Sequence, residues 1–197
     1  MPRQPLQLAV ILGSVREGRF GPTVGNWFVR QARQRDDVTV DVIDLGNVAL
    51  PMTMPAFGAQ AVPEAVHALQ KLTPRLAAAD AFVVVTPEYN HSFPAALKNA
   101  IDWHHQQWHA KPVGFVSYGG MSGGLRAVEA LRPVFAELQA MTIRETVSFH
   151  DALRQFDAEG APLNPDGCNE AARTMLNQLT WWAHALRDAK AASPYVG

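Results

Sequence analysis

Apolar residues along the chain form short runs that alternate with amphipathic segments of helical period. Strands are predicted near residues 6–12, 38–44, 81–86, 113–117 and 142–148, and helices near 23–35, 64–78, 93–106, 124–139 and 168–189. Strands and helices that alternate in this way predict an α/β fold, a parallel sheet with helices on both faces. We expect five strands in the order 2-1-3-4-5, within a single domain spanning residues 1–197.

Composition and charge narrow the possible partners. The 197 residues carry a net charge of −1 with dispersed basic side chains, so no nucleic-acid surface is indicated. No apolar run approaches the roughly 20 residues of a membrane span, and the start Met-Pro-Arg-Gln lacks a signal-peptide core. Cys168 is the only cysteine, so an internal disulfide is impossible. We therefore expect a cytoplasmic protein with no membrane partner.

A histidine cluster raises the question of a metal site. His105 and His109 are spaced to share one helical face if the helix continues that far, and His104 is adjacent. A zinc site needs three or four ligands, and neither a cysteine pair nor a His-Glu-x-x-His pattern completes this one. We expect no metal, and histidines that face solvent or a subunit interface.

The loop after the first strand has the composition of a phosphate-binding loop. It runs from Gly13 to Thr23 and precedes a helix, so backbone N–H groups near Gly21, Thr23 and Val24 are expected to point at an anion. The hydroxyls of Ser14 and Thr23 and the charge of Arg16, with Arg19 as a further candidate, complete the expected phosphate site. The glycine spacing matches neither common nucleotide fingerprint, and glycines for chain reversal with arginines for solubility remain an alternative.

The loop after the third strand offers groups suited to a flat heteroaromatic ring. Pro87 stiffens the turn, Tyr89 presents an aromatic face, and Glu88 and Asn90 add hydrogen-bonding side chains. This loop follows an apolar strand, at the sheet edge where open α/β sheets bind ligands. The alternative is a β-turn and helix cap with an incidental tyrosine.

The loop after the fourth strand is rich in glycine. It begins with Ser117, Tyr118, Gly119 and Gly120 and continues to Gly124, so its backbone can approach a planar ligand closely. Together the three loops predict a mononucleotide site for a ligand with an aromatic head. A separate segment, Leu50 to Phe57, combines prolines, methionines and an aromatic residue; it is either a packing patch or a wall of a substrate pocket.

At these residues the chain resembles the NADPH-dependent FMN reductases of flavodoxin-like fold, a three-layer sandwich. The matching blocks lie between residues 6 and 150: Gly13 to Arg16, Thr86 to Asn90 with Leu97 to Trp103, and Ser117 to Gly124. The resemblance implies that the first loop holds the FMN phosphate, while Pro87 to Asn90 and Ser117 to Gly120 border the flavin ring. Many members carry serine and asparagine where this chain has Arg19 and Gly21.

The resemblance implies an FMN-dependent oxidoreductase that passes hydride from NADPH or NADH through FMN to free flavin, a quinone or a similar acceptor. It also implies a homodimer or homotetramer acting on small molecules. Because the cofactor carries the chemistry, we expect no catalytic side chain, and Glu88 is expected to orient or support the backbone. Two rivals remain open: a flavodoxin-type electron carrier without nicotinamide turnover, and a module that binds another phosphorylated ligand.

Overall fold

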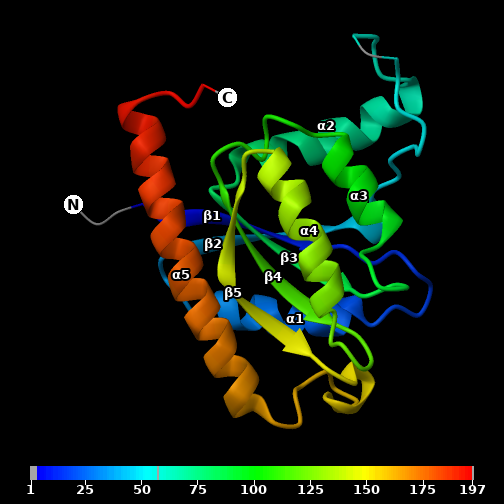
Figure 1. Ribbon diagram of the computed structural model, residues 1–197, viewed down its shortest axis with the longest axis vertical. Helices are drawn as coiled ribbons and strands as arrows, with labels where there is room; N and C mark the ends of the chain where they lie inside the picture. Colours follow the sequence, from blue (N-terminus) through cyan, green and yellow to red (C-terminus); the bar gives the residue numbers. More distant parts are fainter. Residues whose placement is uncertain (1–3, 57, 197) are drawn as a thin grey trace.

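The computed structural model describes residues 4–56 and 58–196, which form a parallel sheet between two layers of helices (Figure 1). Its five strands are β1 (Leu6–Leu12), β2 (Val38–Asp44), β3 (Ala81–Pro87), β4 (Pro112–Tyr118) and β5 (Met141–Phe149). Their order is β2-β1-β3-β4-β5, and every neighbouring pair is parallel. The predicted flavodoxin-like three-layer sandwich is confirmed.

Alternate side chains of the inner strands enter two separate cores. Leu8 and Val10 of β1 pack with α1 (Gly21–Ala32) and α5 (Pro165–Ala192) on one face of the sheet. Ala9 and Ile11 pack on the other face with α2 (Pro63–Ala78), α3 (Ala95–Asp102) and α4 (Leu125–Glu137). Because successive strand residues point to opposite faces, a continuous apolar run is what a strand covered on both sides requires.

The third helix is shorter than predicted. The sequence suggests a helix near 93–106, but α3 begins after Pro94, whose backbone is extended, and ends at Asp102. The indole N–H of Trp108 donates to the carbonyls of Ile101 (3.3 Å) and His104 (3.0 Å), so a side chain satisfies groups that a longer helix would have bonded. A side chain from the turn that follows therefore replaces further helical hydrogen bonds at this end.

All five strands run in one direction, so the segments that follow them meet at one edge of the sheet. The three loops singled out in the sequence follow β1, β3 and β4, and they therefore come together there. Within residues 4–56 and 58–196, no helix has the length and apolar character needed to span a bilayer.

Candidate functional site

A cavity of about 550 Å³ opens at the carboxyl edge of the sheet. Its size falls within the range of small-molecule sites. It is lined by four segments, which follow β1, β3, β4 and β5. Their residues are Arg16, Gly18, Arg19, Phe20, Pro87, Glu88, Tyr89, Tyr118, Gly119, Gly120, Asp151, Ala152, Leu153 and Arg154.

The cavity brings together part of the residue set that the sequence predicts. Residues from all three predicted loops line it: Arg16, Pro87, Glu88, Tyr89, Tyr118, Gly119 and Gly120. The remaining predicted residues are not among those that line it: Ser14, Gly21, Thr23, Val24, Asn90 and Ser117. The sequence therefore predicted which loops form the site more accurately than which of their residues line the cavity.

Arg16 and Arg19 have different partners although both line the cavity. The Arg16 guanidinium makes no ion pair or hydrogen bond with any described residue and lies 5.9 Å from the centroid of the Tyr89 ring. Arg19, in contrast, pairs with Asp44 and donates to the Ser14 carbonyl at 2.7 Å. The charge of Arg16 is thus the one available to an anion in this loop.

Two buried hydroxyls lie beneath the first loop. Neither Ser14 Oγ nor the Tyr118 hydroxyl has a hydrogen-bond partner among the described residues. A Cβ built at Gly21 would lie 2.2 Å from Ser14 Oγ and 2.8 Å from the Tyr118 hydroxyl, so only glycine fits between them and the loop. Burial raises the pKa of Tyr118 far above its ordinary value. Because unpaired buried hydroxyls are costly, these two are groups that a further hydrogen-bond partner would stabilise.

Two of the backbone N–H groups expected to face an anion are already engaged. The N–H groups of Thr23 and Val24 donate to the Phe20 carbonyl at 3.1 and 3.4 Å. Val24 is also fully buried in the core. The expectation that these amides are free is therefore wrong, because α1 begins two residues earlier than predicted and its first turn uses them. The Gly21 N–H, which opens the helix, meets no acceptor in the part of the chain that the structure describes.

The Glu88 carboxylate holds the glycine-rich loop in place. It accepts hydrogen bonds from Ser122 Oγ (2.5 Å), Arg126 Nη1 (3.0 Å) and the Arg126 backbone N–H (3.2 Å). Burial opposes the charged form, but these donors outweigh it and keep the pKa of Glu88 below its ordinary value. Every observed bond is structural, which agrees with the supporting role expected for this residue.

Asn90 and Ser117 shape their loops from outside the cavity. Tyr89 and Ser92 exchange backbone hydrogen bonds of 2.8 and 3.1 Å across Asn90 and His91, whose φ angles are 49° and 74°. Two successive positive φ angles form a tight turn, and asparagine tolerates this backbone better than most residues. Ser117 Oγ donates to the Gly123 carbonyl at 2.9 Å and so fixes the far end of the glycine-rich loop.

The fourth segment, Asp151 to Arg154, was missed by the analysis of the sequence. The Asp151 and Ala152 N–H groups donate to the carbonyls of Gly120 and Gly119, at 2.9 and 3.0 Å. These bonds pin the segment against the glycine-rich loop. The available signal was positional: the segment follows β5, whose carboxyl end must share the edge occupied by the other three loops.

Two residues of the block from Leu97 to Trp103 support a different loop. Asn99 Nδ2 donates to the carbonyls of Leu50 and Pro51, both at 3.2 Å, and the Trp103 indole donates to Pro51 at 3.0 Å. This part of Leu50 to Phe57 is therefore fastened to α3. Phe57 itself lies outside the described residues.

The histidine cluster divides into a buried and an exposed part. His104 is buried and bonded to Thr73 Oγ1 (3.0 Å) and the Ala100 carbonyl (2.8 Å), and burial lowers its pKa. His105 Nδ1 and His109 Nε2 lie 3.1 Å apart. No group of three or more histidine, cysteine, aspartate or glutamate side chains suited to a metal ion occurs among residues 4–56 and 58–196.

The site has the parts that FMN requires. An arginine and two hydroxyls without partners among the described residues, together with the Gly21 N–H, suit a phosphate. The Tyr89 ring and the side-chain-free backbone of Gly119 and Gly120 line the same cavity and suit a planar ring. A sequence model of the NADPH-dependent FMN reductases matches residues 6–154, a span that contains all four cavity segments. The chain belongs to this family.

Individual relatives agree with this assignment. An NAD(P)H-dependent FMN reductase of Schizosaccharomyces pombe is 35% identical over 122 residues, which are 60% of each chain. A quinone reductase of Escherichia coli is 34% identical over 72% of this chain and 76% of its own length. A 2-hydroxy-1,4-benzoquinone reductase of Burkholderia sp is 29% identical over 92% of this chain and 98% of its own.

Solved structures support the fold. The flavoenzyme NAD(P)H:(acceptor) oxidoreductase FerB of Paracoccus denitrificans superposes with a TM-score of 0.71 and covers 91% of this chain and 98% of its own. The two sequences are 21% identical, so this likeness concerns architecture alone.

Proposed function

We propose that the protein is an FMN-dependent NAD(P)H oxidoreductase that passes electrons from NADPH or NADH to free flavin, a quinone or a similar small acceptor. The observation that carries this proposal is the position of Arg16, which pairs with no described residue, beside the Tyr89 ring in a cavity that the bare backbone of Gly119 and Gly120 also lines. The cavity thus offers a charge that suits a phosphate and surfaces that suit a flat ring.

The residues in and around the cavity divide into two groups with distinct binding roles. Arg16, the Ser14 hydroxyl and the Gly21 N–H hold the phosphate, and Arg19 keeps their loop in position through Asp44. Pro87, Tyr89, Gly119 and Gly120 border the ring, and Glu88 fixes the glycine-rich loop through Ser122 and Arg126. Bound FMN would supply hydride acceptance and donation, so the chain's task is to bind, orient and exclude water.

The acceptor class and the assembly belong to the same proposal. Relatives named as quinone reductases favour a quinone-type acceptor. Residues 1–197 act as one domain, located in the cytoplasm, where reduced nicotinamide nucleotides are available. Met121 and Leu153 are apolar yet 87% and 78% exposed near the cavity, which favours a homodimer or homotetramer with subunit contacts at this edge.

Anaerobic mixing of FMN-loaded protein with NADPH and with NADH tests the proposal. The yellow flavin absorbance should bleach with at least one nucleotide and return when a quinone is added. Initial rates measured at several fixed quinone concentrations should then give parallel double-reciprocal lines, because the two substrates use one site in turn. Bleaching by dithionite but by neither nucleotide would instead identify an electron carrier. The net charge of −1 argues against that rival, since carriers that dock by charge need a strong field of one sign.

A further inference from the structure

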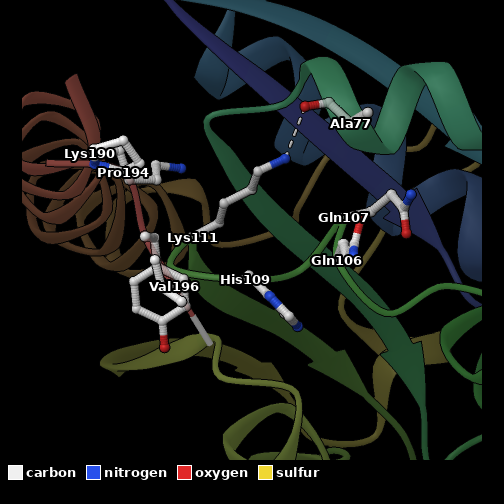
Figure 2. A pocket seen from close by; sticks show the side chains of 9 residues that line it. Ala77, Gln106, Gln107, His109, Lys111, Lys190, Pro194 and Val196 are labelled. Carbon is white, nitrogen blue, oxygen red and sulfur yellow. Dashed lines mark hydrogen bonds between the residues drawn. The ribbon is translucent and has the colours of Figure 1, made fainter.

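A second cavity, of about 670 Å³, lies at the opposite edge of the sheet. We call it the Lys111 pocket. Its wall is formed where α2 ends, where β4 begins and where α5 ends, with Lys111, Lys190 and His109 among its lining residues (Figure 2). The cavity of about 550 Å³ proposed to bind FMN lies at the carboxyl edge of the strands, so the two cavities are separated by the length of the sheet. No part of the proposed reductase chemistry uses this second cavity.

Lys111 is buried with its ammonium held in a fixed position. Its side chain is 7% exposed, and its Nζ donates to the carbonyls of Leu76 and Ala77, both at 2.9 Å. These carbonyls belong to the last turn of α2, where a positive charge is favourable. The Phe82 ring centroid lies 5.4 Å from the same atom. An ammonium has three N–H groups, so one remains without an acceptor among the described residues.

Lys190 brings a second ammonium to the same cavity. It comes from the last turn of α5 and is half-buried, and the side chain extends toward Lys111 in Figure 2. The chain has only four lysines, and half of them line this pocket. Two effects lower the pKa of Lys111 to about 8. The larger is burial of its side chain, and the second is the positive charge of Lys190.

No carboxylate of the described residues pairs with either lysine. Neither ammonium forms an ion pair within residues 4–56 and 58–196, and no acidic side chain lines the pocket. The acidic group whose charge reaches both is Asp80, but its carboxylate accepts from the Gln7 N–H at 2.9 Å and pairs with Arg187 at 3.5 Å. Two partly desolvated like charges without a counter-charge are unfavourable unless an anion binds between them.

The remaining lining groups suit a small polar ligand. Gln106 and Gln107 provide amide donors on the side opposite Lys190 (Figure 2). The Tyr195 ring packs edge-on against His109 at a centroid distance of 6.1 Å and closes part of the rim. Burial and the neighbouring His105 lower the pKa of His109, so this ring is neutral near pH 7 and adds no positive charge of its own.

We propose that the Lys111 pocket binds a small polyanion whose carboxylate or phosphate oxygens accept hydrogen bonds from Lys190 and from the free N–H of Lys111. A charged ligand with several acceptor oxygens can accept hydrogen bonds from both ammoniums. The site is independent of FMN and of the nicotinamide nucleotide. It therefore stands whether or not the proposed reductase activity is found.

Calorimetric titration of the full-length, FMN-saturated protein tests this site. Citrate and pyrophosphate serve as probes in separate titrations at constant ionic strength, and they distinguish carboxylate from phosphate recognition. Lys190→Gln should weaken binding of the preferred probe about tenfold or more, and Lys190→Arg should retain it to within about threefold. Lys71→Gln, which removes an exposed lysine of α2 outside the pocket, should bind as the parent does.

Three results would overturn the proposal. The first is that neither probe binds at millimolar concentration, and the second is equal affinity in Lys190→Gln and the parent. The third is binding lost in Arg16→Ala but kept in Lys190→Gln, which would place the anion in the FMN phosphate loop. Unchanged thermal unfolding of Lys190→Gln shows that the variant is folded, so a loss of binding can be assigned to the pocket.

Discussion

The guanidinium of Arg19 makes two parallel hydrogen bonds to the carboxylate of Asp44, each 2.7 Å long. Arg19 belongs to the first loop and Asp44 ends β2, so this pair fastens the loop to the neighbouring strand. The Arg19 hydrogen bond is the largest influence on Asp44 and lowers the pKa of that carboxyl. Arg19 is therefore a support of the first loop, and in the proposed site the phosphate contact falls to Arg16.

Removal of the Asp44 charge should destabilise the protein in a pH-dependent way. We expect Asp44→Asn to lower the free energy of unfolding at pH 7 by about 1–3 kcal/mol. The lowered pKa means that the contribution is complete above the ordinary value of 3.8 and disappears as the pH falls through the lower, folded-state pKa. Urea unfolding between pH 7 and 3 measures the difference. Asp102→Asn, which breaks the exposed pair with Lys98, should cost under about 0.5 kcal/mol.

Arg16→Ala should weaken FMN binding about ten- to a hundredfold, since a charge-assisted contact contributes roughly 1.5–3 kcal/mol. The fold should survive because Arg16 bonds to no described residue. Quenching of flavin fluorescence on titration gives the dissociation constant. Arg33→Ala, at an exposed position of the cap of α1, is the matched control and should bind FMN normally. Equal affinity in the two variants would contradict the phosphate site.

Two neighbouring glycines should respond differently to added side chains. A Cβ at Gly120 has no neighbour within 4 Å, so Gly120→Ala should keep its stability while the methyl group weakens flavin binding. A Cβ at Gly119 lies 3.2 Å from the Gly124 nitrogen, so Gly119→Val should displace the loop and lose both stability and binding. Melting temperature and FMN affinity separate the two effects. Gly167→Ala, in open space in the first turn of α5, should leave FMN affinity unchanged and raise the melting temperature slightly, because alanine favours a helix more than glycine does.

Glu88→Gln should act on the cofactor through the glycine-rich loop. It removes the charge that Ser122 and Arg126 bind, so we expect a loss of about 1–2 kcal/mol in stability and a several-fold rise in the FMN dissociation constant. Ser122→Ala should reproduce a smaller part of both changes. Glu129→Gln, which alters an exposed ion pair on α4, serves as the control. A large fall in the hydride-transfer rate at saturating FMN with unchanged affinity would instead mark Glu88 as catalytic.

Lys111 should make stability rise at alkaline pH. Its folded-state pKa of about 8 lies below the ordinary 10.5, so the unfolded chain binds more protons between these values. The unfavourable contribution of the buried charge is complete below pH 8 and is relieved as the pH approaches 10.5. Chemical unfolding of the parent and of Lys111→Met over pH 7 to 10 tests this, and the rise should be smaller in the variant. If the free energy of unfolding of the parent and of Lys111→Met changed with pH in the same way, Lys111 would not lose its proton in this range.

The sequence by itself determined the sheet and the edge at which the site lies. Runs such as Leu6 to Leu12 and Ala81 to Val85 predict strands buried on both faces, because each successive side chain enters one of two cores. Parallel strands then place every following loop at one edge, so three of the four cavity segments were predicted from their positions after strands.

Only the tertiary structure decided which groups of those loops face the cavity. The Ser117 hydroxyl donates to the Gly123 carbonyl, and the Thr23 and Val24 amides donate to the Phe20 carbonyl. The Arg19 guanidinium donates to the Asp44 carboxylate. The physical reason is that a loop polar group bonds the nearest available partner, and some of these partners are supplied by elements distant in sequence. The hydrophobic periodicity of the sequence determines which segments become strands or helices. The directions of the polar groups in the loops depend on hydrogen-bond partners that folding brings next to them.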